Sequence, residues 1–318
     1  MENKDSKLKI LVTGGMGFIG RYVVEELQNK GYTPVIFDHH RRLAEEYPTE
    51  VEVFQGDIMD DIAVTEAMAH VQGWIHLAAV LGTQETIKNP RPAAHSNLMG
   101  GLNVLEAAAQ YDLPGSYIAV GNYWMNNTYS ITKTMIERFI DMFNKYRGTR
   151  VNIVRAVNAY GPRQLAVAPF GPGKVRKITP SFVCRALTNM DVEVYGDGSQ
   201  VSDMVYVADV AKALVNAMTK AHMGEIFDVP VEVGPEVNST VQEVAESIIA
   251  ISGSKSKIVN LPMRPGEIPG AVVSADTSTL KLVDMDPKDL VDLSTGMQLT
   301  VDYFKEYLDK TGNHKLES

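Results

Sequence analysis

Residues 12–20 read VTGGMGFIG, and the organisation of the whole chain can be worked out from this stretch. Gly14, Gly17 and Gly20 stand three residues apart, after an apolar run typical of a strand and before a pattern typical of a helix. Glycines at this place permit a tight turn and a close approach of backbone to a pyrophosphate. The start of the helix adds N–H groups and the positive end of a dipole. Because the spacing differs from G-x-G-x-x-G, a glycine turn without a ligand is the alternative.

Short apolar and β-branched segments alternate with helical patterns through the first half of the chain. The expected strands are residues 8–14, 33–38, 51–57, 73–80, 115–121 and 150–157. The expected helices between them include residues 18–31, 100–111 and 129–148. This alternation predicts an α/β fold, a Rossmann-type doubly wound parallel sheet with helices on both faces.

The pattern loosens after Tyr160, which indicates a second and smaller unit. Residues 161–177 are rich in Gly, Pro and basic side chains and are expected to form a loop, and helices mix with short strands after Val233. We therefore predict a smaller mixed α/β C-terminal lobe that binds the substrate. The predicted domains are 1–165, with about 203–232 returning, for the dinucleotide, and 166–202 with 233–318 for the substrate.

The composition restricts the class of protein. The 318 residues are 45% hydrophobic with a formal net charge of −9, which argues against non-specific binding to nucleic acid or to an anionic membrane. No apolar run approaches the roughly 20 residues of a membrane helix, and MENKDSKLK at the start lacks the apolar core of a signal peptide. Cys184 is the single cysteine and cannot form an internal disulfide, so we expect a reducing, cytoplasmic location. We expect no bound metal.

The second expected strand ends in the acid that a dinucleotide site needs. Asp38 is placed to bind both ribose hydroxyls of an adenosine and to repel a 2′-phosphate, which favours NAD over NADP. Arg41 or Arg42 in the following HHRR is the alternative, because a guanidinium pairs with a 2′-phosphate. Asp57, after the third strand, is expected to hydrogen-bond the adenine. The other residues expected along the cofactor are Phe18, Ile19, Ile58, Leu77, Ala78 and Ala79.

Further motifs follow in a recognisable order, namely YSITK (129–133), RAVNAYGPRQ (155–164), VEVYGDGSQVSD (192–203) and MRPGEI (263–268). With them, the chain from about residue 8 to about 305 resembles the extended short-chain dehydrogenase/reductases, specifically the nucleotide-sugar epimerases and dehydratases. The resemblance implies NAD as the cofactor, a nucleotide-diphosphate sugar as the substrate, with a UDP-sugar favoured, and a place for Asn97 along the cofactor.

The resemblance also implies a catalytic pair. Tyr129 would act as a phenolate that takes a proton from a sugar hydroxyl while hydride passes to the nicotinamide. A free tyrosine has a pKa near ~10, so a nearby cation is needed. Lys133, one helical turn on, is expected to supply it, and the oxidised nicotinamide is expected to add more positive charge. In isolation, a Tyr and a Lys at this spacing are more typical of a surface helix pair.

The residues before Tyr129 depart from the family's pattern. The loop that normally precedes the tyrosine is largely deleted, and Asn122 stands where a catalytic Ser or Thr is expected. An amide can donate a hydrogen bond to the sugar and orient it, but it cannot relay a proton as a hydroxyl can. Thr128 is the other candidate hydroxyl, and Tyr123 and Trp124 stand where a dehydratase has its acid.

These departures favour epimerisation at C4 through a 4-keto sugar. A decarboxylase of a nucleotide-activated uronic acid and a 4,6-dehydratase are the enzymatic alternatives, followed by a net reductase or dehydrogenase. A catalytically silent protein that binds NAD or a nucleotide sugar is the alternative from another class.

On the substrate side, the resemblance places Asn158 and Arg264 against the diphosphate and Tyr195 beside the nucleotide base. Ser202 replaces the arginine that the family has in GDGxQxRD, so one phosphate-binding cation is missing. Thr83 is also expected to contact the substrate.

The basic loop before residue 178 has two open interpretations. Its residues either replace the missing cation or form a solvated basic surface; they are Lys174, Arg176 and Lys177.

The helix expected at 129–148 has two apolar stripes where a simple surface helix needs one. One stripe contains Ile136, Ile140 and Phe143, and the other contains Ile131, Met135, Phe139 and Met142. We therefore predict a homodimer in which this helix and the helix containing GLNVLEAAAQ form a four-helix bundle across a two-fold axis.

Overall fold

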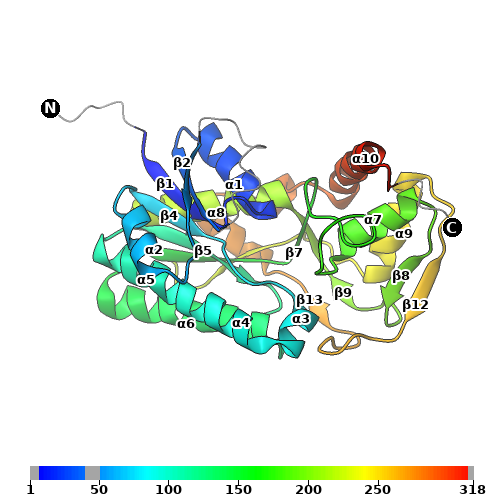
Figure 1. The fold of residues 1–318 in the computed structure, drawn as a ribbon, viewed down its shortest axis with the longest axis horizontal. Coiled ribbons are helices and arrows are strands. Elements are labelled where there is room, and N and C mark those ends of the chain that lie inside the picture. The colour runs from blue at the N-terminus through cyan, green and yellow to red at the C-terminus, as the bar shows by residue number, and fades with distance from the viewer. Residues whose placement is uncertain (1–6, 40–50, 314–318) are drawn as a thin grey trace.

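A computed structural model describes residues 7–39 and 51–313, and its centre is a seven-stranded parallel sheet (Figure 1). The strand order is β11-β6-β5-β4-β1-β2-β3. The strands are β1 (Lys9–Thr13), β2 (Thr33–Asp38), β3 (Glu52–Gln55), β4 (Gly73–His76), β5 (Gly115–Val120), β6 (Val151–Ala156) and β11 (Val231–Val233). The predicted Rossmann-type sheet is confirmed. Its order reverses between β1 and β4, which is where such sheets bind ligands at their carboxyl edge.

Successive side chains of each strand point to opposite faces of the sheet. Both faces carry buried apolar side chains, and helices cover both. Ile10 and Val12 of β1 belong to the core under α1 (Phe18–Asn29) and α8 (Val207–His222). Leu11, between them, belongs to the opposite core. That second core lies under α2 (Asp61–Met68), α5 (Gly101–Gln110) and α6 (Thr128–Arg147).

A smaller lobe has a hydrophobic core of its own, on the right in Figure 1. Its helices and paired strands are α7 (Ile178–Leu187), α9 (Val241–Ser252), α10 (Leu293–Thr311), β8 (Val192–Tyr195) and β12 (Ile258–Leu261). Two short parallel pairs complete the described strands: β7 (Asn158–Tyr160) with β10 (Met204–Tyr206), and β9 (Val201–Ser202) with β13 (Val272–Val273).

The structure corrects the predicted domain boundary at 232/233. That boundary cuts β11, which pairs with β6 in the large sheet. The 3-10 helix η3 (Thr277–Val283) also returns to the larger domain, because its Leu280 and Val283 are fully buried in the core beneath α8. A short 3-10 turn, η4 (Pro287–Asp289), then leads into α10. The tail thus contributes to both domains.

The two predicted stripes of α6 differ in burial. The first stripe, Ile136, Ile140 and Phe143, is buried against the sheet. In the second, Ile131, Met135 and Met142 are 47%, 40% and 37% exposed. The fourth member, Phe139, is half-buried against the core under α6. The second stripe is therefore open at three of its four positions, and the homodimer stays a prediction. Within the described ranges, no helix has the length and apolarity to cross a membrane.

Candidate active site

In the glycine turn after β1, neighbouring backbone atoms leave no room for a side chain at Gly14 or Gly20. Gly14 has φ +70°, its N–H donates to the carbonyl of Phe37 at 2.9 Å, and a Cβ there would lie 2.8 Å from the backbone nitrogen of Ala78. A Cβ on Gly20 would lie 2.4 Å from the carbonyl oxygen of Gly14. Gly17 is the N-cap of α1 and brings no side chain to the first turn of the helix. The backbone at this helix start is thus accessible to a phosphate, as the spacing predicts.

Asp38 lies beside this turn. Its carboxylate is buried, and Oδ2 accepts a hydrogen bond from the backbone N–H of Met16 at 3.1 Å, which orients the side chain at the end of β2. The competing Arg41 and Arg42 lie outside the described residues.

One cavity of about 1030 Å³ begins at the turn and runs between the two lobes. The cofactor residues that the sequence predicts along it and that line it are Gly14, Gly17, Phe18, Ile19, Gly20, Asp38, Asp57, Ile58, Leu77, Ala78, Ala79, Tyr129 and Lys133. A ribose-binding acid, a bare glycine turn and small strand-end residues in one cavity fit a dinucleotide.

Asn97 is the exception among the predicted cofactor residues. It lies in the π-helix η2 (His95–Gly100), is 3% exposed, and is not among the residues that line the cavity. Its Oδ1 accepts from the N–H of Val80 at 2.7 Å, and its Nδ2 donates to the carbonyl of Val80 at 3.1 Å and to Thr132 Oγ1 at 3.1 Å. Because its amide is fully used in these bonds, Asn97 supports the wall behind Val80 instead of lining it.

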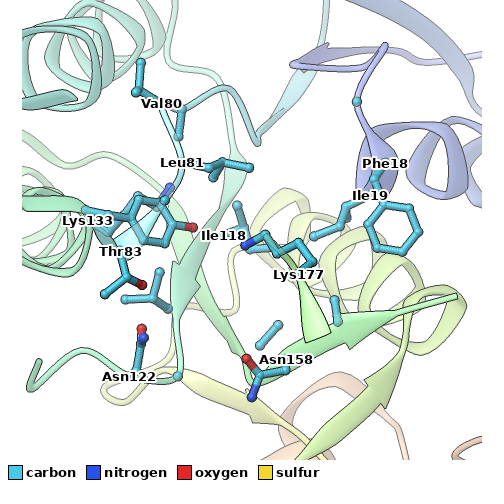
Figure 2. A pocket seen from close by; sticks show the side chains of 18 of the residues that line it. Phe18, Ile19, Val80, Leu81, Thr83, Ile118, Asn122, Lys133, Asn158 and Lys177 are labelled. Atoms are coloured by element: carbon cyan, nitrogen blue, oxygen red, sulfur yellow. The ribbon is translucent and has the colours of Figure 1, made fainter. Parts of the chain in front are cut away.

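Tyr129 and Lys133 stand one turn apart at the start of α6, and both line the cavity. The side chain of Asn127 accepts from the N–H of Ser130 at 2.9 Å and so caps the helix immediately before the tyrosine. Nζ of Lys133 lies 4.0 Å from the centroid of the Tyr117 ring. The helix start therefore fixes the predicted pair at the cavity. Lys133 is labelled in Figure 2.

The pKa values of this pair differ from the expectation. Burial raises the pKa of Tyr129 to about 12, where a lowered value was predicted. Burial lowers the pKa of Lys133 to about 7, and the carboxylate of Glu137 partly opposes that change. An amine with this pKa is only partly charged at neutral pH, so Lys133 supplies part of the charge that Tyr129 needs, and the oxidised nicotinamide is expected to add more. Forming the phenolate requires additional positive charge in the cavity.

Asn122 follows β5 after one residue, Gly121, and lines the cavity. Its Nδ2 lies 3.3 Å from the sulfur of Met125, and its Oδ1 lies 3.3 Å from the hydroxyl of Ser130. The hydroxyl of Thr128 donates to the carbonyl of Thr86 at 2.9 Å, which turns it away from this position. Ser130 is fully buried, and no pattern in the sequence marks it as part of the site.

The smaller lobe and the segments next to it form the other wall. Asn158 and Ser202 are joined by a hydrogen bond of 2.8 Å from Nδ2 to Oγ. The guanidinium of Arg264 lies 4.7 Å from the Tyr195 ring centroid and pairs with Glu267. All five residues line the cavity.

Thr83, the first residue of α3 (Thr83–Lys88), lines the cavity from the larger domain. The three basic residues of the loop before α7 differ in their position relative to the cavity. Arg176, whose Nη1 lies 2.5 Å from the hydroxyl of Tyr195, and Lys177 line the cavity. Lys174 is exposed and is not a lining residue. Its predicted contact with substrate is therefore not supported by its position.

The family model described as the NAD dependent epimerase/dehydratase family matches residues 10–229. The chain belongs to this family. Its cofactor is accordingly NAD, which the glycine turn and Asp38 fit.

Two curated relatives and one solved structure match nearly the whole chain. A UDP-N-acetyl-alpha-D-glucosaminuronate decarboxylase from Bacillus cytotoxicus is 29% identical, over 94% of this chain and 98% of that protein. A putative UDP-glucose 4-epimerase from Methanocaldococcus jannaschii is 29% identical, over 93% of this chain and 98% of that protein. The UDP-glucose 4-epimerase of Thermotoga maritima, solved with UDP-glucose, is 27% identical with a TM-score of 0.83, covering 95% of this chain and all of that one. The family is thus established, while its members differ in reaction.

Proposed function

We propose that this protein is an NAD-dependent epimerase that inverts C4 of a nucleotide-diphosphate sugar, with a UDP-sugar as the favoured substrate, through a transient 4-keto sugar. The observation that carries the proposal is the single cavity shared by three groups of residues. The glycine turn with Asp38, the pair Tyr129 and Lys133, and the lobe residues that include Asn158 and Arg264 all line it.

In this proposal Tyr129 acts as a phenolate stabilised by Lys133; it accepts the proton of the C4 hydroxyl and becomes a neutral phenol. Bound NAD supplies a hydride acceptor at C4 and a positive charge that favours the phenolate. Asn122 donates a hydrogen bond to the sugar oxygen. The keto sugar turns within the cavity, and the same tyrosine returns its proton on reduction from the other face.

Arg264 and Asn158 are proposed to hold the diphosphate, with Tyr195 beside the base. Lys177 is proposed to replace the cation that is missing at position 202, and the hydroxyl of Thr179 is proposed to add a hydrogen-bond donor. Within the described ranges, Nζ of Lys177 has no hydrogen bond or ion pair, and Oγ1 of Thr179 is buried without a partner. An unpaired hydroxyl is costly to bury, and the half-buried Lys177 brings a basic side chain to the same cavity, so an anionic ligand against both is favoured.

Two other reactions begin with the same oxidation. A decarboxylase of a nucleotide uronic acid is the second candidate, because a relative of that class aligns with 94% of the chain at 29% identity. A 4,6-dehydratase is less favoured, since Tyr123 and Trp124 are 42% and 40% exposed and do not line the cavity. A silent binding protein is the candidate from another class.

We also propose a homodimer through the exposed stripe of α6. Ile131, Met135 and Met142 form a row of large apolar side chains at the surface, and burying such a row against a second copy is favourable.

The test of function is incubation of the NAD-loaded protein with a panel of UDP-sugars, followed by NMR. Inversion at C4 supports the epimerase, loss of the C6 carboxylate as CO₂ supports the decarboxylase, and binding without conversion supports the silent protein.

A further inference from the structure

A chain of three buried or partly buried polar side chains connects the cap of α6 to the cavity. Asn127 and Ser130 are 2% and 0% exposed. Asn122 is the next residue in this series of hydrogen bonds, and it lines the cavity. Figure 2 shows its side chain below that of Thr83. Asn122 and Asn127 lie in the short turn before Tyr129, and Ser130 lies in the first turn of α6. The order of donors and acceptors along the chain determines what Asn122 can offer to a ligand.

The direction of the hydrogen bonds can be derived from the backbone outward. The N–H of Ser130 is a donor, so the group of Asn127 that faces it at 2.9 Å is Oδ1. Nδ2 of Asn127 then donates to Oγ of Ser130 at 3.1 Å. Ser130 has one hydroxyl proton, and it is left for Oδ1 of Asn122 at 3.3 Å. Each residue of the chain thereby fixes the orientation of the next.

The contact between Nδ2 of Asn122 and the sulfur of Met125 is consistent with this orientation of the amide. A thioether sulfur can accept a weak hydrogen bond but cannot donate one. Nδ2 of Asn122, at 3.3 Å from the sulfur of Met125, is therefore in the compatible orientation, whereas Oδ1 in that place would meet the sulfur without a proton between them. The second N–H of Nδ2 has no partner among the described residues, so the amide keeps one donor for a ligand.

We propose that Ser130 is a positioning residue that holds the Asn122 amide with its N–H toward the reacting sugar oxygen. This inference rests on the proposed function. A fixed donor suits the C4 oxygen as it becomes a carbonyl oxygen, since a carbonyl accepts hydrogen bonds and donates none. Without the Ser130 hydroxyl, the amide is free to turn and to present its oxygen, which would oppose the developing carbonyl.

The test is a double-mutant cycle on one accepted UDP-sugar. Ser130→Ala should lower kcat roughly fivefold to tenfold with KM changed less than about twofold, as expected for loss of one neutral hydrogen bond. Asn122→Ala should lower kcat on the order of 10²-fold. Adding Ser130→Ala to Asn122→Ala should cost no more than about twofold further, because the residue to be positioned is gone. Ser130→Cys, which keeps a weak donor, should restore part of kcat.

Thr134→Val is the matched control. Its hydroxyl lies on the same helix and donates to the backbone carbonyl of Ser130 at 2.9 Å, without contact to Asn122. It should leave kcat unchanged. If Ser130→Ala lowers kcat equally with and without Asn122→Ala, the serine acts through the fold and the proposal is overturned.

A second readout does not depend on turnover. The side-chain amide signals of Asn122, observed by NMR with 15N-labelled asparagine and assigned through their loss in Asn122→Ser, should shift in Ser130→Ala and remain in place in Thr134→Val. A shift without activity on any sugar would uphold the positioning and contradict the proposed function. Unchanged amide signals in Ser130→Ala would contradict the positioning whatever the enzyme does.

Discussion

Replacing Lys133 with methionine is expected to stabilise the folded chain while it removes turnover. Lys133 is 2% exposed, and burial lowers the pKa of its ammonium from 10.5 to about 7. At about 1.4 kcal/mol per pKa unit, the burial costs at most about 5 kcal/mol of folding free energy. The contact between Nζ and the Tyr117 ring, at 4.0 Å, returns about 1–2 kcal/mol. Allowing for imperfect packing of the new side chain, Lys133→Met should raise the free energy of unfolding by about 2 kcal/mol at neutral pH.

The dependence on pH has a definite sign. Because the pKa of Lys133 is lower in the folded chain, the unfolded chain binds more protons between about pH 7 and pH 10.5. The contribution of Lys133 to stability therefore becomes less unfavourable as the pH rises through that window. The advantage of Lys133→Met should be largest at or below pH 7 and should shrink steadily toward pH 10.

Urea unfolding followed by tryptophan fluorescence, without added NAD, measures both effects. Lys145→Met is the control, because Lys145 is exposed near the end of the same helix, and its change should stay within about 0.5 kcal/mol. A Lys133→Met chain that is less stable than the wild type at pH 7, with the control unchanged, would refute the reasoning about the buried amine.

Three further outcomes are expected. The protein should bind NAD more tightly than NADP, and Asp38→Ser should reduce the ratio of the two Kd values roughly tenfold. Calorimetry that finds NADP bound more tightly would show that Asp38 does not determine the preference for the cofactor. Lys177→Met should weaken UDP binding roughly tenfold because it removes a charge-assisted contact, while Lys174→Met should leave the Kd unchanged; equal effects would contradict the assignment of Lys177 to the diphosphate. Met135→Glu should give a monomer by light scattering, and a wild type that is already monomeric at micromolar concentration would remove the proposed interface.

The sequence predicted well those features that depend on local pattern. The strands from residue 9 to 156 were found because each is a short apolar run between turns, and the glycine turn after β1 was found because few residues other than glycine fit its backbone. Tyr129 and Lys133 were found on one wall because helical periodicity places residues four apart on one face.

The missed features depend on packing between distant segments. Leu280 and Val283 return to the larger domain because they complete the core beneath α8, and no local pattern distinguishes a helix that packs there from one in the lobe. The low pKa of Lys133 follows from the depth of its burial, which spacing does not reveal. The different positions of Lys174 and Lys177 depend on where the loop enters α7.

The central claim is that the enzyme oxidises and then reduces the same carbon, C4, with Tyr129 as the base. The most direct measurement uses an accepted UDP-sugar that carries deuterium at C4 and follows the product by NMR, for the wild type and for Tyr129→Phe. The account predicts an inverted C4 that keeps its deuterium in the wild type. It also predicts a loss of at least about 10³-fold in kcat for Tyr129→Phe, with NAD still bound. Exchange of the C4 deuterium with water, or an active Tyr129→Phe enzyme, would contradict it.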